Sequence, residues 1–151
     1  MVDFVPAGFP RVTPYLKVDG AAAAIQFYVE AFGATERFQM PGPDGKIGHA
    51  EIAFGDSVVM LADLCMDGQQ DPHKLGGTPV TIMVYVPDVD ATYTRAVAAG
   101  AKGTAEPEDR FYGDRSGTVV DAWGHEWHLS THIEDVSEEE MDKRMKAMQA
   151  G

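Results

Sequence analysis

The stretch LKVDGAAAAIQFYVEAFGA, residues 16–34, joins the end of an apolar strand to an alanine-rich helix and a terminating glycine. Asp19 is suited to cap a helix over residues 20–32, and Gly33 suits the position just past its end. The apolar side chains recur at the spacing of one helical face, at Ala21, Ile25, Tyr28 and Phe32. The stretch therefore predicts a strand followed by an amphipathic helix.

The same order of elements returns about 68 residues later. Val86 corresponds to Val18, and an alanine-rich stretch at 89–99 corresponds to the first helix. Each copy closes with a short turn and an apolar strand, at 57–62 and at 124–130. A unit that occurs twice predicts two half-sheets that together enclose one site.

Alternation of apolar and polar residues predicts strands on both sides of each helix. We expect strands at 11–18, 34–40, 49–55 and 58–63 in the first copy, and at 79–86, 101–106, 117–121 and 125–131 in the second. The fold class is therefore α+β, with the order βαβββ in each of two modules. The expected divisions are a first module at 1–65, a linker at 66–77, a second module at 78–135 and a C-terminal helix at 136–151.

Composition excludes several classes of partner. The chain has 151 residues and a formal net charge of −12, and nucleic-acid binding needs a basic face, so we expect no nucleic-acid partner. No stretch approaches the ~20 apolar residues of a membrane span, so we expect no membrane partner. The start, MVDFVPAGFPRV, lacks the features of a secretory signal, and we expect a cytoplasmic location. The lone Cys65 excludes an internal disulfide framework.

The C-terminal helix has its own start signal, because Ser137 and Glu140 fit a capping box. Methionines then recur on one face, at Met141, Met145 and Met148. Two interpretations of this stripe remain open. It packs on its own domain, or it contacts a partner chain in a dimer.

Three segments resemble the vicinal oxygen chelate superfamily, which groups glyoxalases, bleomycin resistance proteins and ring-cleaving dioxygenases. They are LKVDGAAAAIQFYVEAFGA (16–34), HAEIAFGDSVVMLAD (49–63) and YGDRSGTVVDAWGHEWHL (112–129). The YGDR…D-x-x-GH-x-W ending is most similar to the PhnB-like branch. The resemblance covers residues 10–135 and implies two βαβββ modules whose curved mixed sheets wrap a shared cavity, commonly in a homodimer.

Metal-dependent members of this superfamily hold a divalent cation with four side chains, usually His, Gln or Glu. The resemblance places these four positions at Thr13, Met60, Thr81 and His128. Threonine hydroxyls and a thioether are poor ligands for a hard cation, and one histidine falls short of the about three protein ligands of a catalytic site. We therefore expect no metal at these positions and no other cofactor.

Strand alternation directs two further pairs of side chains toward the cavity. His49 and Glu51 suit a general base with its orienter, or hydrogen bonding to a ligand. Glu126 and His128 form the matching pair on the last strand. Two alternatives remain, a simply solvated strand face and a non-standard metal site built from these four residues.

The same alternation predicts a pocket wall of Thr13, Tyr15, Met60, Thr81, Met83 and Tyr85. Arg115 suits an anion contact, because a guanidinium can bind a carboxylate or phosphate bidentately. The alternative for Arg115 is a salt bridge with Asp114 or Asp121.

These features predict a small-molecule binding protein without the usual metal, for which an aromatic or cationic natural product is a suitable ligand. The alternative is a lyase, isomerase or dioxygenase of the same superfamily, with His49, Glu51 and His128 as the base or the ligands. A third hypothesis is a structural or regulatory dimer without a ligand.

Overall fold

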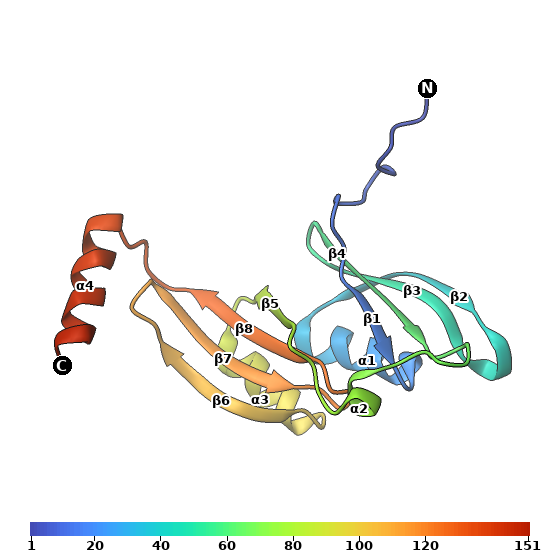
Figure 1. Cartoon of the computed structure of the whole chain (residues 1–151). Coiled ribbons are helices and arrows are strands. Elements are labelled where there is room, and N and C mark those ends of the chain that lie inside the picture. The colour runs from blue at the N-terminus through green and yellow to red at the C-terminus, as the bar shows by residue number, and fades with distance from the viewer. The chain divides into compact units, whose positions relative to one another are not determined.

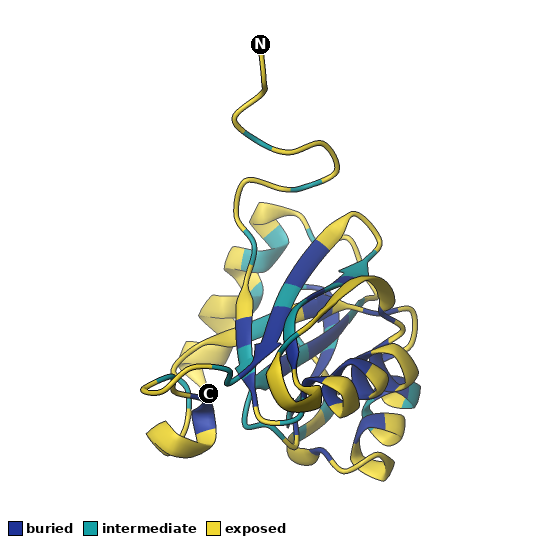
Figure 2. Cartoon of the chain, turned by 90° about the vertical axis from the view of Figure 1, so that its right-hand side faces the viewer, coloured by how far each residue is buried: buried dark blue, intermediate teal, exposed yellow.

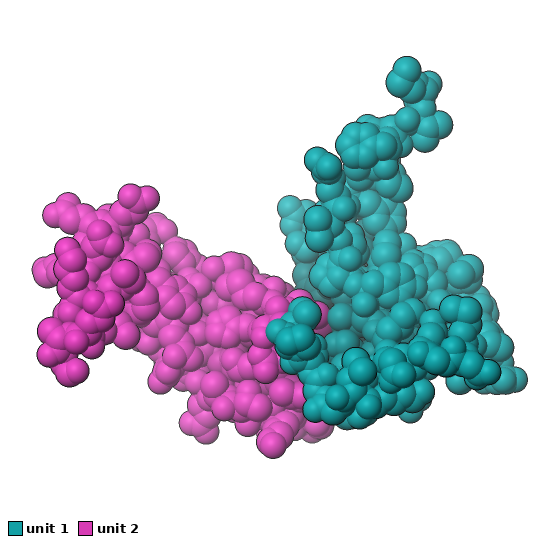
Figure 3. Space-filling model, viewed as in Figure 1, with its two compact units in different colours: residues 1–80, 122–125 teal, residues 81–121, 126–151 magenta.

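The computed structural model describes residues 1–151, which form two compact units (Figure 3). The first unit comprises residues 1–80 and 122–125, and the second comprises residues 81–121 and 126–151. The elements of the first are β1 (Tyr15–Val18), α1 (Ala21–Phe32), β2 (Thr35–Pro41), a 3₁₀ turn (Pro43–Gly45), β3 (Ile47–Phe54), β4 (Ser57–Asp63) and α2 (Pro72–Leu75). Those of the second are β5 (Thr81–Tyr85), α3 (Val89–Ala98), β6 (Lys102–Asp109), β7 (Asp114–Val120), β8 (Glu126–His132) and α4 (Glu138–Ala150) (Figure 1).

Each unit contains one mixed four-stranded sheet. The strand order is β1-β4-β3-β2 in the first sheet and β5-β8-β7-β6 in the second. In both sheets the first pair of strands is parallel and the other pairs are antiparallel. The predicted α+β fold with two βαβββ modules is confirmed.

The repeat extends to the pairing of individual residues. β1 and β4 pair Tyr15 with Met60, and β5 and β8 pair Met83 with His128. Both members of the second pair lie 68 positions after their counterparts (83 − 15 and 128 − 60). The 68-residue offset found in the sequence therefore also relates the paired residues of the first sheet to those of the second.

The core of each unit lies between its sheet and one helix, α1 in the first unit and α3 in the second, as the buried positions indicate (Figure 2). Alternate strand residues of the first sheet are buried beneath α1, among them Leu16, Val18, Ala50, Ile52, Val59 and Leu61. In the second sheet Trp127 and Leu129 are fully buried. Burial of such side chains is the main favourable contribution to folding. None of the helices combines the length and the apolar character that a membrane crossing requires.

The first residues of α1 and of α3 each donate to an oxygen from the last strand of their module. Asp63 at the end of β4 accepts hydrogen bonds from the backbone N–H groups of Gly20 (2.8 Å) and Ala21 (2.9 Å). Thr131, which lies 68 positions later, accepts one from Val89 N–H (2.9 Å). The prediction that Asp19 caps α1 is therefore wrong, because the cap comes from a distant strand.

Residues 122–125 belong to the first unit through contacts with α1 and β1. The Trp123 ring lies 5.7 Å from Phe27 and 6.1 Å from Tyr28, between ring centroids. His125 Nε2 lies 2.9 Å from the carbonyl oxygen of Lys17. Trp123 is thus packed against α1.

The C-terminal helix α4 is attached to the second unit by polar contacts. Ser137 accepts a hydrogen bond from Glu140 N–H (3.2 Å), which confirms the predicted cap. Arg144 donates to both carboxylate oxygens of Glu134 and to the carbonyl oxygen of Phe111. No residue of α4 is buried; of the predicted stripe, Met141 is half-buried, whereas Met145 and Met148 are exposed and do not pack on their own domain.

Candidate functional site

One face of the first sheet is not covered by α1, and we call it the open face. Its residues lie at alternate positions along the strands and come from all four strands. They are Tyr15, Lys17, Phe38, Met40, His49, Glu51 and Met60. The open face therefore gathers aromatic, thioether and charged groups from segments far apart in the sequence.

Two hydrogen bonds in series connect the polar groups of the open face. The Tyr15 hydroxyl lies 2.6 Å from His49 Nδ1, and His49 Nε2 lies 3.2 Å from a carboxylate oxygen of Glu51. The side chains of His49 and Glu51 are only 20% and 12% exposed. A carboxylate that orients an imidazole, which in turn contacts a hydroxyl, is an arrangement suited to moving a proton or fixing a polar ligand group.

Aromatic rings surround this polar chain. The His49 ring lies 5.4 Å from the ring of Tyr15 and 6.3 Å from that of Phe38, between centroids. The ammonium group of Lys17 lies 4.8 Å from the centre of the Tyr15 ring, within the range of a cation–π contact. An apolar wall with a few convergent polar groups is the usual composition of a small-molecule site.

The environment keeps the Tyr15 phenol protonated. Partial burial raises the pKa of Tyr15 above its ordinary value, and the nearby Cys65 and Glu51 add to the rise because each carries negative charge when ionised. At neutral pH Tyr15 therefore keeps the proton that it can donate.

The structure places the predicted residues His49, Glu51, Tyr15 and Met60 together on the open face, and Met60 pairs with both Tyr15 and Glu51. The sequence alone did not reveal that Tyr15 contacts His49, since these residues lie 34 positions apart. Alternation along each strand assigned both residues to one face, and only the strand order makes them neighbours.

The predicted residues of the second unit also share one sheet face, but they form separate pairs. The Thr81 hydroxyl donates to Glu126 (2.5 Å). Met83 lies opposite His128, whose Nδ1 is 3.2 Å from the Thr118 hydroxyl. Glu126 and His128 thus have partners within their own sheet.

A second polar cluster, which sequence reasoning missed, is centred on the buried Asp114. This carboxylate accepts hydrogen bonds from the hydroxyls of Tyr85 (2.9 Å) and Ser130 (3.2 Å), and its other oxygen lies 2.8 Å from His132 Nδ1. His132 Nε2 lies 2.8 Å from Asp135. The sequence did contain one signal: Ser130 and His132 are two residues apart on one strand and so share a face, and Asp114 is the first residue of the neighbouring strand.

The cluster shifts the pKa values of its members in opposite directions. Burial acts to raise the pKa of Asp114, but the hydrogen bonds from His132, Tyr85 and Ser130 outweigh it and lower that pKa. Hydrogen bonds to Asp135 and Asp114 raise the pKa of His132. His132 is therefore favoured as an imidazolium between two carboxylates.

Arg115 lies on the helix-facing side of β7. Its guanidinium donates to both carboxylate oxygens of Asp90 in α3, at 2.7 and 2.9 Å, and to Asp109 at 3.0 Å. Its partners are thus other acidic residues than the expected Asp114 or Asp121. Because Nε and both Nη atoms of Arg115 already donate to carboxylates, its role is structural: it connects α3 to the sheet.

The positions at which metal-dependent relatives bind their cation do not fit a metal here. Met60 and His128 lie on strands, Thr81 begins β5 and Thr13 precedes β1. Their donors are two hydroxyls, a thioether and one imidazole, of which only the last is a strong ligand. No group of three or more His, Cys, Asp or Glu side chains in the chain is arranged to hold a metal ion.

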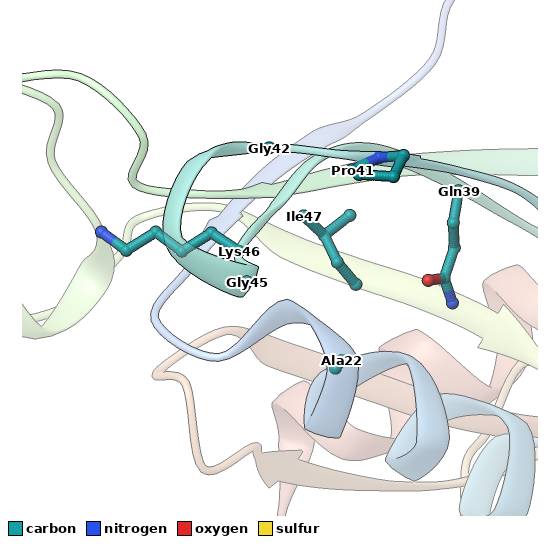
Figure 4. A pocket seen from close by; sticks show the side chains of 7 residues that line it. All are labelled: Ala22, Gln39, Pro41, Gly42, Gly45, Lys46 and Ile47. Atoms are coloured by element: carbon teal, nitrogen blue, oxygen red, sulfur yellow. The ribbon is translucent and has the colours of Figure 1, made fainter.

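A pocket of about 330 Å³ lies on the opposite, helix-covered side of the first sheet (Figure 4). Gln39 and Ile47 point from the β2–β3 hairpin toward Ala22 in the first turn of α1, and glycines form much of the remaining wall. The pocket contains neither His49 nor Glu51. We assign the candidate site to the open face, because the convergent polar groups are there.

Known proteins are similar to this chain in sequence and in structure. The uncharacterized protein Rv0887c of Mycobacterium tuberculosis H37Rv is 44% identical over 146 residues, which cover 94% of this chain and 86% of that protein. The crystal structure of TioX from Micromonospora sp. ML1 is 24% identical with a TM-score of 0.61, over 85% of this chain and all of that one. The PhnB protein from Bacillus cereus is 16% identical with a TM-score of 0.61, over 81% and 99% of the two chains.

The two solved structures share the fold and, at these identities, indicate nothing finer. Residues 9–129, most of both βαβββ modules, match one family. This chain therefore belongs to the Glyoxalase/Bleomycin resistance protein/Dioxygenase superfamily.

Proposed function

We propose that this protein binds a small organic molecule on the open face of the first sheet, without a metal at the positions that its metal-dependent relatives use. The observation that carries the proposal is the Tyr15–His49–Glu51 chain set among aromatic and thioether side chains. The apolar residues offer contact area for a flat ligand, and the polar chain offers a fixed hydrogen-bonding group.

The Glu51 carboxylate and the aromatic rings of the open face favour a ligand with a positively charged or hydrogen-donating group. Glu51 is a carboxylate with a side chain only 12% exposed, and its partner His49 carries a charge only when protonated. The face of Phe38 attracts cations through its ring quadrupole, as the Tyr15 ring attracts the ammonium group of Lys17. An aromatic or cationic natural product meets both features.

We further propose that the protein belongs to the PhnB-like branch of the superfamily. The proposal rests on the residues YGDR (112–115) and on D-x-x-GH-x-W (121–127).

The test of binding begins with elemental analysis of the purified protein, followed by screening of aromatic amines and neutral aromatic compounds by protein-observed NMR. We expect no stoichiometric metal, and we expect ligands that shift the amide signals of β1 and β3. Met60→Ala should weaken binding, whereas Met66→Ala, a matched change at an exposed loop residue, should not. One tightly bound metal per chain, or ligands that shift only other parts of the spectrum, would overturn the proposal.

A second candidate is an enzyme of the superfamily, a lyase, isomerase or dioxygenase in which His49 is the general base. The contact of His49 with Glu51 favours it, because a carboxylate that orients an imidazole is a common feature of acid–base sites. This candidate predicts that His49→Ala and His128→Ala abolish turnover while circular dichroism stays unchanged. Unchanged turnover in both variants would remove it.

A further inference from the structure

We propose that Tyr15 determines the specificity of the open face, and that protonation of His49 reverses the direction in which the Tyr15 hydroxyl hydrogen-bonds to a ligand. The proposal rests on the binding function proposed above. Its consequence is that the site takes a hydrogen-donating ligand group when His49 is neutral and a hydrogen-accepting group when His49 is charged.

The neutral state follows from the way both ring nitrogens of His49 are used. An ionised carboxylate only accepts hydrogen bonds, so the contact with Glu51 places the single N–H of a neutral imidazole on Nε2. Nδ1 is then an acceptor, and the Tyr15 hydroxyl, 2.6 Å away, must donate to it. The side of the Tyr15 oxygen that meets a ligand then presents only lone pairs.

The charged state has the opposite polarity. An imidazolium donates from both nitrogens, so Nδ1 donates to the Tyr15 oxygen. The phenolic proton is released from the contact with His49 and becomes available to a ligand. The raised pKa of Tyr15, of which burial is the largest cause, favours a phenol that keeps its proton.

Other groups around His49 act on this equilibrium from each neighbouring element. Glu51 on β3 favours the imidazolium, and Lys17 on β1 opposes it. Cys65, just after β4, favours it only as a thiolate. The remaining neighbours, Phe38 and Met40 on β2, carry no charge. The one close charge partner that contacts the ring directly is therefore Glu51.

The experiment compares two probes of similar shape, benzylamine as its ammonium ion and benzoate, by protein-observed NMR titration at pH values from about 5 to about 8. We expect the ratio of benzylammonium to benzoate affinity to rise about tenfold as His49 loses its proton, the effect of one reversed hydrogen bond. Loss of the positive charge of His49 would by itself also favour benzylammonium over benzoate, because the repulsion of the cation is removed. Tyr15→Phe separates the two, because it should reduce the change in ratio, while Tyr112→Phe, the same substitution in the second unit, should not.

A second measurement requires no ligand. Long-range ¹H–¹⁵N NMR of the histidine side chains should show the neutral His49 ring protonated on Nε2 and unprotonated on Nδ1, and Tyr15→Phe should reduce that preference. A ring protonated on Nδ1, or a probe ratio that Tyr15→Phe leaves unchanged, would overturn this inference and leave the binding function standing. If the ring is protonated as expected but neither probe shifts the amides of β1 and β3, the inference that Tyr15 selects ligands fails together with this choice of site.

Discussion

At the scale of single residues, two buried carboxylates organise the polar contacts of the two units. Asp63 uses one oxygen for the start of α1 and the other for the backbone N–H of Ile47 (2.9 Å), where β3 begins. Asp114 uses one oxygen for Tyr85 and Ser130 and the other for His132. Buried polar groups that lose such partners destabilise a protein more than an average hydrogen bond stabilises it.

Replacement of Asp63 by alanine should therefore be costly. Asp63→Ala leaves the N–H groups of Gly20, Ala21 and Ile47 without their acceptor, and we expect the free energy of unfolding to fall by about 3 kcal/mol. Urea denaturation measures this change. Asp67→Ala removes the same side chain at an exposed position and should have little effect. Equal losses in the two variants would contradict the assigned role of Asp63.

The Asp114–His132 pair should stabilise the fold in a defined pH window. The raised pKa of His132 means that its contribution is complete below its ordinary value of 6.5 and is lost as the pH rises through the folded value. The lowered pKa of Asp114 means that its contribution is present above its ordinary value of 3.8 and is lost as the pH falls through the folded value. The pair therefore contributes most between these two ordinary values.

His132→Gln tests this window through the pH dependence of unfolding. The difference in unfolding free energy between wild type and variant should be largest near pH 5.5 and should shrink toward pH 9. Urea denaturation at a series of pH values measures it. A difference that stays constant across the range would mean that His132 acts without its charge.

At the scale of elements, α4 differs from α1 and α3 because it buries no side chain. Its attachment depends on Arg144, and exposed ion pairs contribute little to stability. The helix itself has a good start in Ser137 and three acidic residues in its first turn, which suit the helix dipole. The element is thus well formed locally but weakly held.

Removal of residues 138–151 should leave both modules folded. We expect the truncated chain to lose helical circular dichroism and to keep nearly the same melting temperature, because no core residue is removed. Arg144→Ala in the full chain should give a melting temperature similar to that of the truncated chain. Loss of a cooperative transition on truncation would show that α4 covers part of a core.

At the scale of the whole molecule, most of the fold was predictable, because the 68-residue repeat and the strand alternation can both be recognised in the sequence without knowing which strands pair. The helices over 20–32 and 89–99 lie within one residue of α1 and α3 at each end. Asp63 as the cap of α1, Trp123 against α1 and Tyr15 beside His49 were not predictable, since each depends on which strands become neighbours. Alternation gives the face of a side chain, and only the folded sheet gives its partner.

The family resemblance also leads us to propose that the protein is a homodimer. The exposed Met145 and Met148 of α4 provide an apolar surface for such a contact. Sedimentation equilibrium should give twice the chain mass of 16.3 kDa. Met145→Lys combined with Met148→Lys should shift the equilibrium toward single chains if α4 forms the contact, and a single-chain mass for the wild type would refute the dimer.

The cap that Asp63 provides has a consequence for the order of events during synthesis. Gly20 and Ala21 leave the ribosome well before the carboxylate that holds them, which lies 43 and 42 residues further along the chain. Until β4 has emerged, the nascent α1 lacks both its cap and the central strands on which it packs. The first module therefore closes late, once β4 has emerged. In the second module Asp88 caps α3 locally through Ala91 N–H, so only the contact of Val89 N–H with Thr131 depends on the last strand.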